Sequence, residues 1–438
     1  MQEFLKALFL VFINDLENGL KSTVKFFADD TSLYSIVHNP HTSAEDLNHD
    51  LEKISQWAYQ WKMSFNPDPT KQAVEVLFSC KNISPDHPPL YFNGVEVERV
   101  SEHKHLGLTL DSKLTFVTHI NEKISTARKW IGVIKHLSSY LPLKSLDQIY
   151  KMHIRPHLDY CDIIFHIPVI TNDFDSSLTL NYQMNALEKT QYQAALAVSG
   201  AWKGTNRDKI YEELGWETLD HRRFFRRLTQ FYKIINKLTP EYLHHSIPSG
   251  NVGPRSTNVL RAIPCRTDRY KKSFYPDTVS SWNNIGPELR DAQSLSIFKK
   301  NILKIIRPVK NDIFNIFNPS CIKWIFQLRV GLSPLKSHKK RHNFADTPFD
   351  TCPCTLNAET TQHFLLECPN YNEHRQELLE PVDSILLLND MDNITVNTKV
   401  HLLLYGHKKL NFHENRVILK ATIKYINKTG RFSQMFLA

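Results

Sequence analysis

The chain has 438 residues, 41% of them apolar, and a formal net charge of +9 with an isoelectric point near 9.0. A chain of this length can form two or three domains with buried cores, and a mild excess of positive charge favours a polyanionic partner. Its seven cysteines are too few, and odd in number, for a secreted disulfide framework, so we expect an intracellular protein, nuclear or cytoplasmic.

An apolar stretch over residues 4–13 is the first predicted element. It has no basic region before it and no small-residue cleavage site after it, so it does not fit a signal peptide. It is also shorter than the roughly 17–25 residues of a transmembrane helix. We expect a buried helix here and, since no later segment is long and apolar enough, no membrane partner.

A β-hairpin is predicted next. Residues 24–27 and 32–37 are short apolar stretches on either side of residues 28–31, a small acidic segment. This arrangement is typical of a hairpin with the acidic residues at its turn. A helix should follow, because Ser43 can serve as its N-cap and apolar side chains then continue at helical spacing as far as Trp61.

More strands are predicted before residue 118, and helices after it. A strand is expected over residues 73–79, and a second pair of strands at 90–97 and 105–110 with a turn at Asn93-Gly94. Apolar residues then recur at helical spacing, and residues 245–275 are irregular. The helices are expected near residues 119–137, 143–154, 187–198, 223–238 and 296–306.

These patterns predict an α+β protein in four segments. They are an α+β part over residues 1–118, a helical part over 119–244, a linker and basic helical region over 245–335, and a carboxy-terminal region with cysteines and histidines over 336–438.

Asp29 and Asp30 are candidate metal ligands. Phosphoryl transfer with two divalent ions needs carboxylates on a rigid backbone, and a tight hairpin turn provides one. Aspartates are also common in ordinary turns, which is the alternative for such a pair alone. The aromatic residue and alanine before the pair, and the apolar stretches on both sides, favour metal binding.

The segments around this pair resemble a known family. Residues 13–16 (Ile-Asn-Asp-Leu) and 24–31 (Val-Lys-Phe-Phe-Ala-Asp-Asp-Thr) resemble the catalytic palm hairpin of reverse transcriptases from non-LTR (LINE-type, jockey-like) retrotransposons. Residues 61–66 with Lys71 resemble the next palm motif, and residues 105–111 resemble the primer-grip hairpin. Resemblance continues beyond the palm at residues 155–160, 202–205 and 213–216.

The resemblance implies a fold and an activity. The fold would be a partial polymerase palm, made of antiparallel hairpins and a helix, followed by a mainly helical thumb. The intact parent would be an RNA-directed DNA polymerase that uses an RNA template, a DNA primer and Mg²⁺ held by Asp29 and Asp30. Lys71 would assist proton transfer to the leaving pyrophosphate, and Leu106 and Gly107 would lie in the primer grip.

The chain departs from this family in what precedes the hairpin. A polymerase of this kind requires a third carboxylate on an upstream strand and fingers that hold the template, and 26 residues precede Phe27. Asp15 belongs to the segment that leads into the hairpin, so it is not the missing acid. Metals with two ligands in place of three are held poorly. We therefore predict that this truncated chain does not polymerise alone.

Cys352, Cys354, His363 and Cys368 are candidate zinc ligands in a Cys-x-Cys-x8-His-x4-Cys arrangement. Three thiolates and an imidazole within seventeen residues suit tetrahedral Zn²⁺, and four protein ligands leave no open position, so the zinc would be structural. The closing His-x4-Cys half resembles retroviral zinc knuckles. The alternative is three free cysteines near a core histidine. The expected task is nucleic-acid contact or local folding.

Basic residues form three candidate groups of phosphate contacts. Phosphate contacts supply most non-specific affinity for nucleic acid, whereas the alternative is a solvated helix face or a flexible linker. The candidates are Arg222, Arg223, Arg226 and Arg227 on adjacent helical turns, Lys271 and Lys272 among aromatic residues, and Lys339, Lys340 and Arg341 ahead of the cysteines.

Two other functions stay open. One is a non-catalytic protein that binds RNA or DNA through the basic surface and the zinc cluster. The other is the inert product of a decayed element, in which half a palm would expose apolar strands and tend to aggregate.

Overall fold

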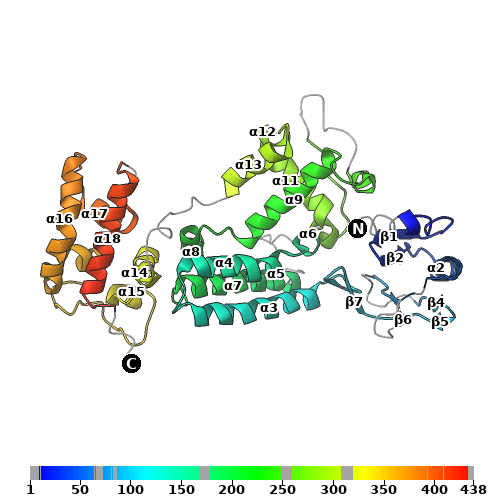
Figure 1. Cartoon of the computed structure of the whole chain (residues 1–438), viewed down its shortest axis with the longest axis horizontal. Coiled ribbons are helices and arrows are strands. Elements are labelled where there is room, and N and C mark those ends of the chain that lie inside the picture. Colours follow the sequence, from blue (N-terminus) through cyan, green and yellow to red (C-terminus); the bar gives the residue numbers. More distant parts are fainter. Residues whose placement is uncertain are drawn as a thin grey trace. The chain divides into compact units, whose positions relative to one another are not determined.

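The computed structural model describes residues 9, 11–63, 65, 73–79, 81, 86–166, 178–247, 259–306, 319–391, 393–407 and 409–432. The chain divides into two compact units, Met1–His119 and Ile120–Ala438, each of which is described by itself (Figure 1). None of the described helices combines the length and the apolar character needed to cross a membrane.

The first unit contains small two-stranded sheets and one long helix, so strands and helices both occur, as the α+β prediction requires. Three of the described sheets, β1–β2, β4–β5 and β7–β8, are antiparallel, and β3–β6 is parallel. The elements are β1 (Thr23–Phe27), β2 (Asp30–Tyr34), α2 (Pro40–Gln60), β3 (Val74–Glu75), β4 (Tyr91–Phe92), β5 (Val95–Glu96), β6 (Glu98–Arg99), β7 (Glu102–His105) and β8 (Leu108–Asp111).

The predicted turn at Asn93-Gly94 is present, but the strand pairing around it differs from the prediction. Residues 90–97 and 105–110 were expected to pair with each other, but each segment belongs to its own hairpin. Asn93-Gly94 and Leu106-Gly107 both have two consecutive positive φ angles. This backbone is that of a type I′ turn, whose twist matches the twist of two adjoining strands, so the chain closes locally.

The start of α2 also differs from the prediction. Asn39, and not Ser43, is the N-cap: its side chain accepts hydrogen bonds from the N–H groups of His41 and Thr42, and Pro40 is the first helical residue. Proline suits this position because its missing N–H is not needed there and its φ is already helical.

Asp50 of α2 attaches the β1–β2 hairpin to the helix. Its completely buried carboxylate accepts hydrogen bonds from the N–H groups of Lys21 (3.0 Å) and Ser22 (2.7 Å) and from the Ser22 hydroxyl. Burial would raise the pKa of Asp50, but these hydrogen bonds outweigh burial and hold the pKa below its usual value. The residues that lead into β1 are thereby tied to α2.

The second unit is helical in its described part. Its first group of helices is α3 (Val117–Leu137), which begins in the first unit, α4 (Leu143–Ile149), η2 (Tyr150–Ile154), α5 (Arg155–Asp159), α6 (Asp162–Phe165), α7 (Leu178–Ser199), α8 (Arg207–Leu214) and α9 (Leu219–Ile235). A second group packs on α9 and comprises η3 (Glu241–Ser246), α10 (Asp268–Lys271), α11 (Phe274–Asn284), α12 (Pro287–Arg290) and α13 (Leu295–Ile306).

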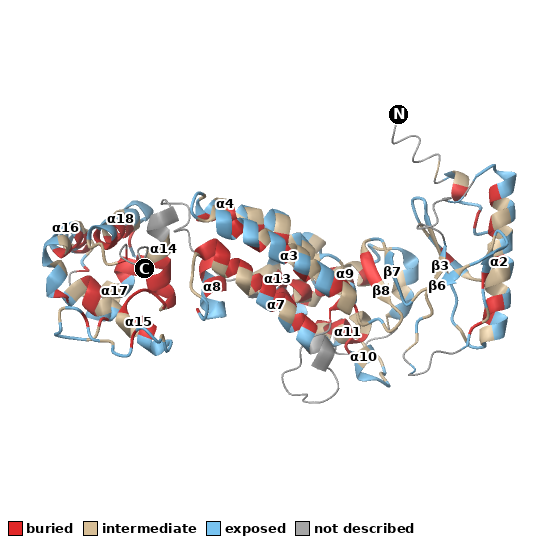
Figure 2. Cartoon of the chain, turned by 90° about the horizontal axis from the view of Figure 1, so that it is seen from below, coloured by how far each residue is buried: buried red, intermediate tan, exposed pale blue. Residues whose placement is uncertain are grey.

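The carboxy-terminal helices share one core. Apolar side chains from α14, α16, α17 and α18 pack together with Phe364 and Leu365, and buried residues mark the inner sides of these helices in Figure 2. The elements are α14 (Pro319–Val330), α15 (Lys336–Arg341), η5 (His363–Glu367), η6 (Pro369–Tyr371), α16 (Asn372–Leu388), α17 (Val396–Tyr405) and α18 (Phe412–Lys428).

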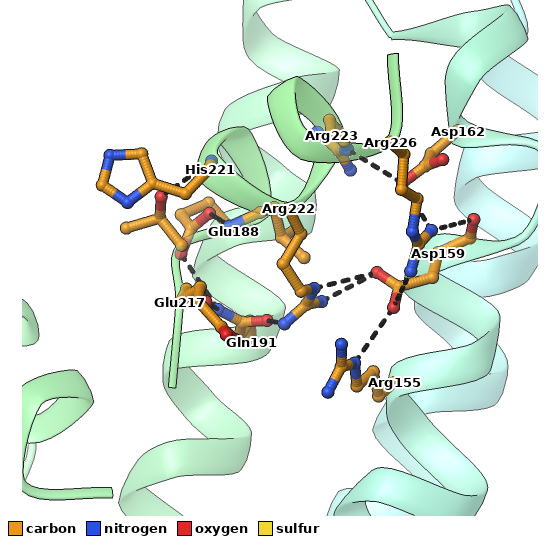
Figure 3. A network of polar contacts seen from close by, with 12 residues as sticks. Arg155, Asp159, Asp162, Glu188, Gln191, Glu217, His221, Arg222, Arg223 and Arg226 are labelled. Atoms are coloured by element: carbon orange, nitrogen blue, oxygen red, sulfur yellow. Dashed lines mark hydrogen bonds and ion pairs between the residues drawn. The ribbon is translucent and has the colours of Figure 1, made fainter. Parts of the chain in front are cut away.

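Asp159, the last residue of α5, lies at the centre of a buried polar network (Figure 3). Its carboxylate pairs with Arg222 (2.8 Å) and Arg226 of α9 and with Arg155 (3.2 Å), and Arg226 also pairs with Asp162 of α6 (2.8 Å). Burial would raise the pKa of Asp159, but the guanidinium groups of Arg222 and Arg226 lower it. The carboxylate is therefore ionised and joins α5 to α9.

The same network reaches helix α7. The amide oxygen of Gln191 accepts hydrogen bonds from Arg222 (2.8 Å) and from the hydroxyl of Tyr150 (2.8 Å), and its amide nitrogen donates to the carbonyl of Glu217 (3.0 Å). Each polar atom of this buried amide thus has a partner, which a side chain in a low-dielectric interior requires.

The network corrects the expectation that Arg222, Arg223, Arg226 and Arg227 form an exposed basic surface. Arg222, Arg223 and Arg227 are buried, and Arg226 is half-buried. Their guanidinium groups face acids inside the unit, as Arg227 does with Asp277 (3.1 Å). Helical spacing placed them on adjacent turns, but it did not reveal that acids from other helices would cover them.

We predict that Asp159→Ala lowers the free energy of unfolding by about 3–5 kcal/mol, because it leaves buried guanidinium groups without their carboxylate. Urea unfolding followed by far-UV circular dichroism measures this loss. Asp220→Ala is the matched control, since Asp220 is an exposed acid in the first turn of α9. That substitution should cost at most about 1 kcal/mol. Equal losses in the two variants would contradict the structural role of Asp159.

Candidate functional site

The acidic pair lies at the tip of the β1–β2 hairpin. Phe27 pairs with Asp30 across the strands, and Ala28 and Asp29 form the turn, with Ala28 at a φ of 54°. Both aspartates are exposed. The predicted hairpin is therefore present, and its strands are only partly buried: Val24 is 7% exposed, whereas Phe27 is 64% exposed.

The surroundings of the pair add few ligands. Three or more His, Cys, Asp or Glu ligand atoms lie close enough to share an ion at one place among the described residues, the Cys/His cluster. Within the described residues, therefore, no third carboxylate lies beside Asp29 and Asp30. Asp15 accepts a hydrogen bond from the indole N–H of Trp57 (3.0 Å). Lys71, the expected proton donor, lies outside the described residues.

The expected primer-grip residues occupy the turn of the β7–β8 hairpin. Leu106 and Gly107 have φ angles of 46° and 80°, and the Leu106 side chain is 37% exposed. At the end of β8, the Asp111 carboxylate accepts hydrogen bonds from the N–H groups of Thr115 (3.0 Å) and Phe116 (2.7 Å). Asp111 thus shapes the junction with α3, a role that the sequence pattern did not reveal.

The four predicted zinc ligands converge on one point. Their ligand atoms all lie within 4.8 Å of one another: the sulfurs of Cys352 and Cys368 are 3.6 Å apart, and Nε2 of His363 is 3.2 Å from the sulfur of Cys354. Cys352, His363 and Cys368 are buried, and Cys354 is half-buried. A separation of 3.6 Å between sulfurs excludes a disulfide, whose S–S bond is about 2.05 Å.

Local backbone geometry explains this convergence. A bridge between Thr351 and Ala358 closes a small loop, and the Cys352 N–H donates to the carbonyl of Asn357 (2.8 Å), so the loop holds the first two cysteines. The short helix η5 then begins at His363, and the N–H of Cys368 donates back to the His363 carbonyl (2.7 Å). The loop and the helix end therefore present the two ligand pairs to each other.

The donor set fits zinc. With Zn–S bonds of about 2.3 Å, tetrahedral ligands lie about 3.8 Å apart, close to the 3.6 Å between Cys352 and Cys368. Burial raises the pKa of both these thiols. Burial also acts to raise the pKa of Cys354, but the Leu356 N–H and the His363 imidazole outweigh it and lower the pKa. A cation would stabilise three thiolates at this point, because thiolates are the form that binds metals.

A carboxylate lies close to the second ring nitrogen of His363. Nδ1 of His363 lies 3.5 Å from a carboxylate oxygen of Glu367, while Nε2 faces Cys354. Metal-bound histidines commonly direct their second nitrogen to a carboxylate in this way. Glu359 lies between the two ligand pairs in the sequence, and it is buried. It pairs with Arg431 (2.6 Å), so it joins the loop to the residues that follow α18.

The other predicted basic residues divide between buried and exposed positions. Lys271 is exposed, but Lys272 is buried. Lys339 is also buried and pairs with Asp346 (2.6 Å), which differs from its expected surface role. Lys340 and Arg341 are exposed, and Lys340 pairs with Asp350 (2.9 Å).

The chain is similar to several mobile-element polymerases. It is 32% identical over 125 residues, 28% of this chain, to a probable RNA-directed DNA polymerase from transposon BS of Drosophila melanogaster, and 30% identical over 149 residues, 33% of this chain, to that of the X-element of the same species. It is 26% identical over 214 residues, 46% of this chain, to the RNA-directed DNA polymerase from mobile element jockey of Drosophila funebris.

These matches cover 13%, 16% and 22% of the length of the three relatives. The chain matches no protein-family model and no solved structure. The resemblance of residues 13–16 and 24–31 to jockey-like elements is thus supported by similarity over longer segments. Over these segments the chain is similar to RNA-directed DNA polymerases of Drosophila non-LTR retrotransposons.

Proposed function

We propose that the chain is a fragment of an RNA-directed DNA polymerase and that Asp29 and Asp30 are metal ligands of its nucleotidyl-transfer site. The observation that carries this proposal is the exposed acidic pair at a tight hairpin tip, in a chain whose relatives are such polymerases. Divalent ions such as Mg²⁺ would stabilise the attacking and leaving oxygens of phosphoryl transfer when bound. The substrates would be an RNA template and a DNA primer, with Leu106 and Gly107 near the primer.

We also propose that this chain does not polymerise alone. Two-metal catalysis depends on ligands that hold both ions in place, and small errors in position slow the reaction severely. In the described part of the chain, no third carboxylate gathers with Asp29 and Asp30. The exposed turn offers each ion too few ligands, so metal binding should be weak.

We predict that the chain binds Mn²⁺, a spectroscopic substitute for Mg²⁺, with a Kd on the order of 1 mM. The double variant Asp29→Asn/Asp30→Asn should lose this binding in an electron paramagnetic resonance titration. The control is Asp46→Asn/Glu45→Gln, which removes two acids from α2. Primer extension on an RNA template should give no product with the unaltered chain or with the acidic-pair variant. Extension that disappears in the acidic-pair variant would contradict the proposed inactivity, and unchanged Mn²⁺ binding would contradict the role of the pair.

The Cys/His cluster supports a second proposal, that Cys352, Cys354, His363 and Cys368 hold a structural zinc ion. The four ligand atoms surround one point, and four protein ligands leave no position for substrate. Phe364 and Leu365, between the ligands, belong to the core of the carboxy-terminal helices. Zinc would therefore stabilise the packing of η5 against α16 and α18.

We predict one zinc per purified chain, measured by inductively coupled plasma mass spectrometry. His363→Ala and Cys354→Ser should each lower the zinc content to well below one, because three ligands bind zinc less tightly than four. Cys265→Ser is the control, since this thiol lies away from the cluster and contacts the carbonyl of Ile263. A zinc content near zero in the unaltered chain would refute the site.

Binding of RNA or DNA without catalysis is a second candidate function. It is favoured by the exposed cations Lys271, Lys340 and Arg341, the last two of which precede the Cys/His cluster. We predict that the affinity for labelled RNA falls as salt rises, because bound cations displace the counterions of the phosphates. Fluorescence anisotropy across a salt series measures the slope, and an affinity that does not respond to salt would exclude this function.

A further inference from the structure

We infer that helix α7 carries a binding track for a single-stranded stretch of RNA or DNA. The inference rests on the proposed nucleic-acid function and assigns it to residues other than those of the acidic hairpin and the Cys/His cluster. The track consists of two hollows that follow one another along α7.

The first hollow, of about 570 Å³, lies between α3 and α7. Helix α3 contributes the amide of Asn121, the hydroxyl of Ser125 and the cations of Arg128 and Lys129, and α7 contributes the ring of Tyr182. In Figure 1 the two helices lie alongside each other in the middle of the helical unit. Hydrogen-bond donors, positive charge and an aromatic ring thus face one space.

The second hollow, of about 380 Å³, lies between α7 and the start of α8. It is lined by Lys189 and Tyr192 of α7 and by Asn206 and Arg207. The two hollows follow one another along α7, because Tyr182 and Ala186 line the first and Lys189 and Tyr192 line the second. Tyr182 and Tyr192 are about 15 Å apart along a helix, which is the length of about four stacked nucleotides.

Three cations of the track have no acidic partner. Arg128, Lys129 and Lys189 are exposed, and no carboxylate of the described residues forms an ion pair with them. Exposed lysines and arginines are common on protein surfaces, but these three line the two hollows along α7. Phosphates are ligands that match such cations in charge.

The acids of the track are already occupied. Glu188 is buried, and its carboxylate accepts hydrogen bonds from the hydroxyl of Tyr211 (2.7 Å) and the N–H of Leu219 (2.8 Å). Asp208 lies 3.4 Å from Arg207. The electrostatic potential along α7 is therefore positive. It attracts a polyanion and does not favour an uncharged, apolar partner.

The two tyrosines indicate unpaired bases. Tyr182 is 70% exposed in the first hollow, so its ring is free to receive a base. Tyr192 is half-buried, and its hydroxyl donates to the carbonyl of Thr205 (2.7 Å), which fixes the ring in the second hollow. Bases stack on aromatic rings only when they are not enclosed in a duplex, so the occupant is a single strand.

The test removes the three cations together. In the full chain, Arg128→Gln/Lys129→Gln/Lys189→Gln should weaken the binding of a fluorescent single-stranded 12-mer at least about tenfold at moderate salt. It should also reduce the slope of log K against log salt by about 2, since each phosphate contact contributes about 0.7. Tyr182→Ala should weaken binding about tenfold through lost stacking. All these positions are exposed, so the far-UV circular dichroism spectrum should not change.

A matched variant, Lys135→Gln/Lys144→Gln/Lys209→Gln, removes the same charge from exposed positions outside both hollows and should change the affinity less than about twofold. Equal losses in the two triple variants would overturn the track, as would tighter binding of a 12-base-pair duplex than of the single strand. RNA and DNA strands are titrated in parallel, and preferential binding of either supports the track. If the unaltered chain binds no strand, the proposed nucleic-acid function itself fails.

Discussion

The helical unit depends on the buried carboxylate of Asp159. Arg155, Arg222 and Arg226 all pair with it, so one ionised group joins α5 to α9. Arg222 extends the connection to α7 through Gln191, and this fixes the helix that carries the inferred track. Such a group is costly to bury unless its partners are complete, so these helices can pack in few other ways. The ionised Asp159 carboxylate therefore helps to fix the position of α7 and of the side chains on its surface.

Two of the segments whose sequence resembles retrotransposon polymerases, residues 155–160 and 213–216, contribute to this interior. Trp216 stacks on Tyr150 with ring centroids 3.6 Å apart, and its indole N–H donates to Asp147 (2.7 Å). Glu213, in the same segment, pairs with Arg329 of α14 (2.8 Å), which connects α8 to the carboxy-terminal helices. These segments thus connect helices through ring stacking, a hydrogen bond and an ion pair. Residues that make such contacts have little freedom to vary in size or charge, because buried polar groups each need a hydrogen-bond partner.

The first unit is held differently. Its described sheets are two-stranded, and an isolated hairpin has little stability in water. The β1–β2 hairpin gains its support from Asp50, whose buried carboxylate receives the N–H groups that precede β1. The acidic tip therefore belongs to a hairpin that this carboxylate ties to α2. In the second unit, the Cys/His cluster brings four ligand atoms within 4.8 Å of one another.

The sequence by itself determined the features that depend on nearby residues: the hairpin at Asp29 and Asp30, the change to helices near residue 118, and the converging Cys352 and Cys368, because turn chemistry, apolar periodicity and ligand spacing are local. Only the tertiary structure decided which polar groups are buried. The arginines at 222, 223 and 227 read as surface charge until Asp159 and Asp277, distant in the chain, were placed against them. Arg128 of α3 and Lys189 of α7 likewise line hollows only because α7 packs beside α3 and the start of α8. Charge pairing between helices depends on their packing, and one-dimensional spacing does not contain it.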